Sequence, residues 1–475
     1  MNDISQPATI PPQPAEPVEQ ALYEIRKKIY PRAVTGSFAT ARWAFVWLTQ
    51  LIYYGLPWLT WNDRQAVLFD LASRKFYIFG LVFWPQDIVY LTVLLIVSAY
   101  SLFLFTAVAG RLWCGYACPQ TVYTEMFMWI ERKVEGERLA RMKLDRGGLS
   151  VRKLSLKAIK HGLWIALALW TGFTFVGYFT PITLLWGKVW SAGLGGWETF
   201  WILFYGFATY GNAGWMREQV CKYMCPYARF QGVMFDPDTL IITYDRKRGE
   251  PRGARGKGVD YKAKGLGDCV DCGICVQVCP TGIDIRNGLQ YECIGCGACV
   301  DGCDQVMAKL DYPKGLIRYS TENALQQGLG GKQIARRMVR PRVLLYGGIL
   351  VVIVIAALAT LAARVPVKVD VIRDRANVTR DSGDPLVQNV YRLQIMNTQE
   401  RAARFTVAVH GIEGIKLLGE PQPIEVRPAS SRWVPVRIEV PRQSASPGSN
   451  PIQFIVESVG EPPIRIVEKT TFVVQ

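Results

Sequence analysis

The stretch that decides the fold reads GDCVDCGICVQVCPTGIDIRNGLQYECIGCGACVDGCD, residues 267–304. Its eight cysteines form two sets with the same spacing, C-x2-C-x2-C-x3-C, and a proline follows the first set. Three closely spaced thiolates and a fourth a turn later are typical ligands of a [4Fe–4S] cluster, and in two-cluster chains the fourth cysteine binds the other cluster. The stretch therefore predicts a domain that holds two [4Fe–4S] clusters.

The crossed ligand rule assigns each cysteine to one cluster, as in bacterial ferredoxins. Cluster one takes Cys269, Cys272, Cys275 and Cys303, and cluster two takes Cys293, Cys296, Cys299 and Cys279. Zinc sites favour two C-x2-C pairs over such triplets. Disulfides are disfavoured in the reducing cytoplasm, where we expect this stretch. Iron–sulfur clusters are therefore the predicted cofactors.

Five stretches are apolar and long enough to cross a bilayer, which takes about 20 residues of helix. The clearest, VLLYGGILVVIVIAALATLAA, contains no charge. The others contain glycine, threonine or proline, which membrane helices tolerate. We expect five transmembrane helices at 43–61, 87–109, 161–181, 198–216 and 343–363.

The loop charges predict the orientation, because loops rich in lysine and arginine stay in the cytoplasm. Residues 110–160 contain 11 of them, whereas 62–86 contain three and 182–197 contain one. We therefore expect a multi-pass protein of the bacterial inner membrane, with its N-terminus in the cytoplasm and its C-terminus in the periplasm. The expected parts are a disordered N-terminus (1–42), four membrane helices (43–216) with a cytoplasmic loop (110–160), a cytoplasmic ferredoxin-type domain (217–342), a fifth helix (343–363) and a periplasmic domain (366–475).

A second cysteine pattern occurs twice, as CGYACP at 114–119 and CKYMCP at 221–226. Each copy follows an even-numbered predicted helix, so both belong on the cytoplasmic face. The cysteines are Cys114, Cys118, Cys221 and Cys225. Four interpretations stay open: small buried residues, ligands of a further cluster, a redox-active dithiol, or a soft-metal site in which thiolates favour Cu(I).

Other cofactors and partners find little support. The chain has two histidines, His161 and His410, and no C-x-x-C-H haem motif. No P-loop or G-x-G-x-x-G pattern joins a strand to a helix, which argues against a bound nucleotide or flavin. The net charge of +16 follows mostly from the basic cytoplasmic loops, so no nucleic-acid partner is expected.

The last hundred residues predict a different domain. Polar and apolar residues alternate in short runs such as RFTVAVHG (404–411) and RIVEKTTFVV (465–474), with turn residues between them. Several short strands of this kind are typical of a β-sandwich. We therefore expect an immunoglobulin-like β-sandwich at 366–475.

The stretches GRLWCGYACPQTV, VCKYMCPYARFQ and 267–304 together resemble the CcoG/FixG (RdxA) family of membrane polyferredoxins, over nearly the whole chain. The resemblance implies reduction of Cu(II) to Cu(I) for copper loading during assembly of cbb3-type cytochrome c oxidase. Copper would then be a substrate, and the four C-x3-C cysteines its ligands or the electron exit. Assembly factors of the oxidase or a copper transporter would be partners, with an unknown electron donor.

Two other functions stay open. The chain could be a quinol-oxidising or electron-delivering ferredoxin subunit of a respiratory reductase, or an assembly scaffold whose clusters sense redox state. The resemblance favours the first function, a membrane cupric reductase that serves oxidase assembly.

Fusions to alkaline phosphatase test the predicted orientation, because this enzyme needs the disulfides that form outside the cytoplasm. The enzyme fused after Gln475 should be active, and fused at Glu250 it should be inactive. The reverse activities would mean that the number of membrane crossings before Glu250 is wrong.

Overall fold

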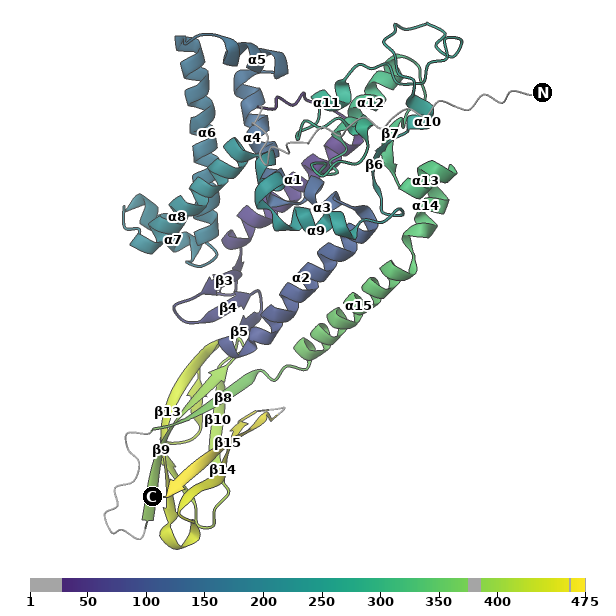
Figure 1. The fold of residues 1–475 in the computed structure, drawn as a ribbon. Coiled ribbons are helices and arrows are strands. Elements are labelled where there is room, and N and C mark those ends of the chain that lie inside the picture. Colours follow the sequence, from purple (N-terminus) through teal and green to yellow (C-terminus); the bar gives the residue numbers. More distant parts are fainter. Residues whose placement is uncertain (1–27, 375–385, 461–462, 475) are drawn as a thin grey trace, which may run out of the picture.

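The computed structural model describes residues 28–374, 386–460 and 463–474. An iron–sulfur segment and a β-sandwich lie at opposite ends, and two long helices run side by side between them (Figure 1). The prediction of disorder at 1–27 lies outside the described residues.

Three helices of the described residues are long and apolar enough to cross a membrane, by length and composition. They are Pro85–Ala109, which contains α2 (Ile88–Ala109), α6 (Val151–Val176) and α15 (Pro341–Ala362). The α2 and α15 helices are neighbours: the rings of Tyr100 and Tyr346 lie 6.0 Å apart. At their shared end, Arg340 donates a hydrogen bond to the carbonyl oxygen of Ala107 at 2.7 Å.

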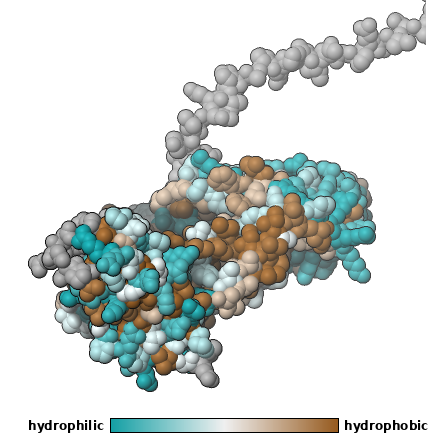
Figure 2. Space-filling model, turned by 90° about the horizontal axis from the view of Figure 1, so that it is seen from below, coloured by the Kyte–Doolittle hydropathy of each residue, from teal (hydrophilic) through white to brown (hydrophobic). Residues whose placement is uncertain are grey.

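The outward side chains of these two helices are large and apolar. Leu94, Leu95, Val352 and Ile355 are all more than half exposed. Figure 2 shows hydrophobic side chains gathered into a continuous area between hydrophilic surfaces. These large apolar side chains have no packing partner among the described residues, which is expected for helices that face lipid.

The two other predicted spans are helical but short. Residues 43–61 fall largely in α1 (Ser37–Gly55), which ends before Pro57. Residues 198–216 comprise α8 (Gly196–Thr209) and a π-helical stretch, η3 (Tyr210–Met216). The count of five crossings therefore stays a prediction. The third span begins earlier than expected, because Ser150 caps α6 by accepting a bond from the Lys153 amide at 3.2 Å.

The prediction of disorder through residue 42 was wrong for residues 28–42, which the structure describes. Residues 28–36 lie against the iron–sulfur segment, where the Arg32 amide donates to the Gln277 carbonyl at 2.8 Å. The carboxylate of Asp301 then accepts bonds from the amides of Phe38 and Ala39, at 3.3 and 2.7 Å. The first amides of a helix need such an acceptor, so a distant acid caps α1.

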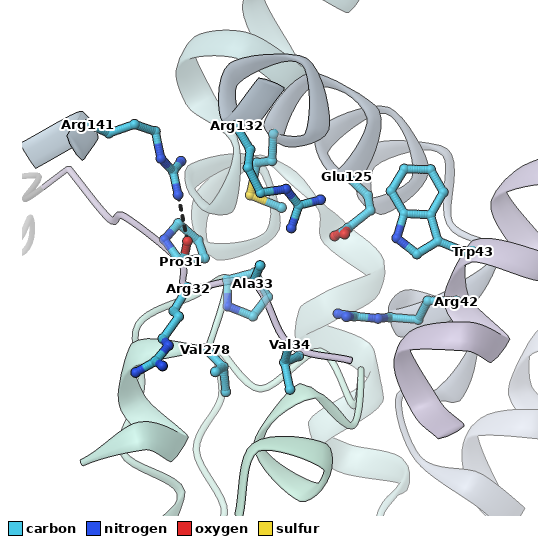
Figure 3. A pocket seen from close by; sticks show the side chains of 12 residues that line it. Pro31, Arg32, Ala33, Val34, Arg42, Trp43, Glu125, Arg132, Arg141 and Val278 are labelled. Carbon is cyan, nitrogen blue, oxygen red and sulfur yellow. Dashed lines mark hydrogen bonds between the residues drawn. The ribbon is translucent and has the colours of Figure 1, made fainter. Parts of the chain in front are cut away.

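The loop at 110–160 is mostly helical. It contains α3 (Leu112–Tyr116), α4 (Pro119–Glu135) and α5 (Arg138–Arg146). Buried Glu131 on α4 pairs with Arg141 at 3.2 Å and with Arg217 at 2.9 Å. Figure 3 shows Arg141 reaching the backbone of Pro31, to which it donates at 2.6 Å. These ion pairs join the loop to the N-terminal segment and to the end of the fourth predicted span.

The remaining short elements connect these parts. A small sheet between α1 and α2 was not predicted, because its strands have at most four residues. The sheet contains β3 (Val67–Asp70), β4 (Lys75–Ile78) and β5 (Leu81–Phe83), beside the two-residue pair β1 (Thr60–Trp61) and β2 (Arg64–Gln65). The short helices are α7 (Ile182–Trp190), α10 (Arg246–Gly249), α13 (Glu322–Gln327) and α14 (Gly331–Met338).

The predicted C-terminal β-sandwich is confirmed. Its two four-stranded antiparallel sheets have the orders β12-β10-β14-β15 and β11-β13-β9-β8. Tyr391, Phe405, Phe454 and Phe472 fill the core between the sheets. The strands are β8 (Val367–Arg373), β9 (Leu386–Asn397), β10 (Ala403–His410), β11 (Lys416–Gly419), β12 (Ile424–Val426), β13 (Ser430–Pro441), β14 (Gly448–Ser458) and β15 (Arg465–Val474).

Asp87 joins the sandwich to the start of α2. Its buried carboxylate accepts the Trp84 amide at 3.0 Å and pairs with Arg364 at 2.6 Å and with Lys368. Glu198, in the first turn of α8, pairs with Lys188 at 2.7 Å. Both acids therefore have structural partners.

Asp87→Ala should destabilise the junction by about 3–5 kcal/mol, because two cations would lose a buried partner. The thermal midpoint of the detergent-solubilised protein measures this. Glu420→Ala is the control, because its pair with Arg432 is exposed and such pairs contribute about 0–1 kcal/mol. Equal midpoints for the two variants would contradict the role given to Asp87.

Candidate iron–sulfur site

The iron–sulfur segment is a pair of similar loops on a small scaffold. The strands β6 (Ile241–Tyr244) and β7 (Ile317–Ser320) pair with each other. Helix α11 (Ile274–Gln277) starts inside the first cysteine set and α12 (Ala298–Lys309) inside the second. Gly273 and Gly297 precede these helices with φ of 65° and 73°, a left-handed conformation that glycine adopts without strain.

The structure brings cysteines of the two sets close to one another, and their assignment to two clusters stays a prediction. Charges of Cys275, Cys272 and Cys269 all act on Cys303, across the set boundary. In the same way, the charge of Cys279 acts on Cys293 and on Cys296. The fourth cysteine of each set thus lies near cysteines of the other set.

These thiols fit an iron–sulfur cluster chemically. Burial raises the pKa of Cys275 to about 11 and the pKa values of Cys293 and Cys303 to about 12. Neighbouring thiolates raise them further, so the thiolates need positive charge nearby. The iron ions of a cluster supply that charge, and thiolates are their usual ligands. Cys272 is the exposed member of the set, at the edge nearest solvent.

The two C-x3-C pairs have the same local layout. Cys118 and Cys225 each stand in extended backbone directly before a helix whose first residue is proline, namely α4 and α9 (Pro226–Met234). Proline fits the first turn because its missing N–H has no acceptor there. Cys114 lies in α3, and Cys221 lies in a short π-helix, η4 (Val220–Met224).

The structure brings the two pairs together. The thiol of Cys114 lies 3.3–3.5 Å from the amide group of Gln231, on the helix that Cys225 begins. Arg111 donates to the carbonyl of Ala228 on the same helix at 2.8 Å. Burial raises the pKa of Cys221 to about 12, and the charges of Cys118, Cys114 and Cys225 add to the rise. All four sulfurs are therefore within electrostatic range of one another.

The first pair also touches the loop of cluster two. Cys114 packs against a group of buried residues that includes Ile294 and Cys296. A β-carbon on Gly115 would stand 2.7 Å from the carbonyl oxygen of Gly295 and 2.9 Å from the α-carbon of Cys296. The backbones are in direct contact at this point, and only glycine fits between them.

The second repeat has lysine where the first has glycine. Lys222 pairs with Glu292 at 3.5 Å, next to the ligand Cys293. Gly115, Arg111, Gln231 and Asp301 are the site residues that the sequence analysis missed. The difference between CGYACP and CKYMCP was the one signal in the sequence that pointed to the close contact.

Known proteins share this organisation. Residues 216–322 match the family model of a 4Fe-4S dicluster domain, and residues 91–136 match a 4Fe-4S binding domain. Residues 357–475 match the IG-like fold at the C-terminus of FixG. The protein is therefore an iron–sulfur electron-transfer protein of the membrane ferredoxin type.

Relatives identify the family. The chain is 40% identical over 411 residues to protein RdxA of Cereibacter sphaeroides, covering 84% of this chain and 86% of RdxA. It is 39% identical over 428 residues to the nitrogen fixation protein FixG of Rhizobium meliloti, covering 83% and 81%. The ferredoxin-type protein NapH of Haemophilus influenzae is 26% identical over 212 residues, covering 39% and 66%. The chain belongs to the FixG/RdxA family, as the sequence motifs predicted.

Gly115→Ala should separate α3 from the cluster-two loop, because its methyl group would overlap backbone atoms that cannot rotate away. We expect a lower thermal midpoint and a changed or lost signal of cluster two in electron paramagnetic resonance (EPR). Gly162→Ala on α6 is the matched control, because nothing lies within 4 Å of its added methyl group. An unchanged EPR signal in Gly115→Ala would contradict the contact.

Proposed function

We propose that the protein takes single electrons from a cytoplasmic donor and delivers them to Cu(II) at the C-x3-C site. The Cu(I) formed would serve copper loading during assembly of cbb3-type cytochrome c oxidase, with assembly factors or a copper transporter as partners. The convergence of the four C-x3-C cysteines beside the cluster-two loop is the observation that carries this proposal. This convergence supports an electron path that continues from the ferredoxin segment to the C-x3-C site.

The entry point that we propose is the exposed edge of cluster one, at Cys272. The adjoining segment 245–265 contains eight lysines and arginines but three acids. Its backbone is bonded to the first cysteine loop, because the Gly253 amide donates to the carbonyl of Cys269 at 3.2 Å. An acidic one-electron carrier would be attracted to this segment.

The exit is the C-x3-C site. Bound clusters would supply one-electron chemistry, and one electron reduces one Cu(II) to Cu(I) with no proton to place. The chain's part is to position a thiol-rich site against cluster two, through Gly115 and Cys114. Soft thiolates favour Cu(I) over Cu(II), which would increase the driving force for the reduction.

A cavity supports a second candidate, quinol oxidation. It has a volume of about 410 Å³ and lies between α4, α6 and η3. His161 and Trp215 line it with their rings stacked 5.7 Å apart, and Tyr210 lies 3.0 Å from the His161 ring nitrogen. Arg217 and Glu218 line both this cavity and the pocket that contains Cys221. A quinol headgroup there would lie on a route to the C-x3-C site.

Anaerobic stopped-flow measurement tests the copper proposal. The dithionite-reduced and desalted protein should form one Cu(I), trapped by a Cu(I)-specific chelator, for each electron lost from its clusters. The variant Cys114→Ser with Cys221→Ser should react at least about tenfold more slowly, because serine is a harder and less acidic ligand.

The ferredoxin clusters are the internal control. The double variant should keep the EPR signals of clusters one and two, whereas Cys272→Ser should lose that of cluster one. A double variant that reduces Cu(II) at the wild-type rate would contradict the exit site. Rapid electron exchange with a quinol analogue and none with Cu(II) would favour the second candidate.

A further inference from the structure

We propose that Cys114, Cys118, Cys221 and Cys225 together hold a third [4Fe–4S] cluster. The two C-x3-C-P copies present their thiols to one region, from the ends of two helices with the same layout. Each copy supplies two thiols, and a cubane needs four. The number of ligands therefore matches only when both copies contribute to one site.

The family model of a 4Fe-4S binding domain covers only two of the four cysteines that a cluster needs. The 4Fe-4S binding domain at 91–136 contains two cysteines, Cys114 and Cys118. The fold supplies the other two, because Gln231 and Arg111 join the second copy to the first. Arg111 also donates to the carbonyl of Tyr291, so its cation lies between both copies and the cluster-two loop. A cation at this place would stabilise an anionic cluster.

The position gives the cluster a role in electron transfer. Cys114 packs against the buried residues around Cys296, a predicted ligand of cluster two, and the backbone of Gly115 touches that of Cys296. A third cluster would therefore continue the row of clusters toward the membrane helices. The inference rests on the proposed electron path and replaces direct copper ligation by these four thiols with a cluster from which Cu(II) would take its electron.

Metal analysis of the anaerobically purified full-length protein tests the inference. We expect about 12 iron and 12 sulfide per chain, since each cubane contains four of each. The variant Cys114→Ser with Cys221→Ser should contain about eight of each, and its EPR spin count after reduction should fall by a third.

Cys272→Ser is the matched control, because it removes a ligand of cluster one and should leave the third cluster's signal. A wild-type content of about eight iron would overturn the inference without any variant. Eight iron together with one Cu(I) per chain that the double variant loses would assign the cysteines to copper instead. Full iron content without Cu(II) reduction would keep the third cluster and contradict the proposed function.

Discussion

The contact of Gly115 with Gly295 and Cys296 is the constraint on which the arrangement depends. Electron transfer needs the redox centres to be close, and a side chain at residue 115 would hold the two loops apart. The surrounding bonds serve the same contact. Arg111 ties α3 to both α9 and the cluster-two loop, and Lys222 reaches Glu292 from the second repeat. The two copies of one motif have thus diverged: the first makes the backbone contact and the second an ion pair.

Much of this could be predicted from the sequence, because cluster ligands and membrane helices have strict local rules. Cysteine spacing was sufficient to predict a domain with two clusters, which the dicluster family model supports. A long apolar run without charge was sufficient to predict α15. Alternating polar and apolar residues were sufficient to predict the β-sandwich. The convergence of Cys114 with Cys221 was not predictable from spacing, since 107 positions separate them. It follows from the packing of α3, α4 and α9, which only the fold specifies.

The errors have a common physical cause. Residues 1–20 are polar and rich in proline, which suggested disorder through residue 42, but the hydrogen bonds of residues 28–42 go to partners far away in the sequence. Residues 110–160 were expected only as a charged cytoplasmic connection between membrane helices, and their helices were not predicted. Their carboxylates and cations pair internally, around Glu131 and Arg141.

The cap on α1 has a consequence for biogenesis. The carboxylate that accepts the Ala39 amide belongs to Asp301, 262 positions later. The ribosome therefore makes α1 long before its cap exists, and the helix start stays incomplete until α12 has folded. Because α12 carries the predicted cluster ligands Cys299 and Cys303, we expect its folding to be coupled to iron binding. The start of α1 thus becomes complete only after α12, which is made much later, has folded.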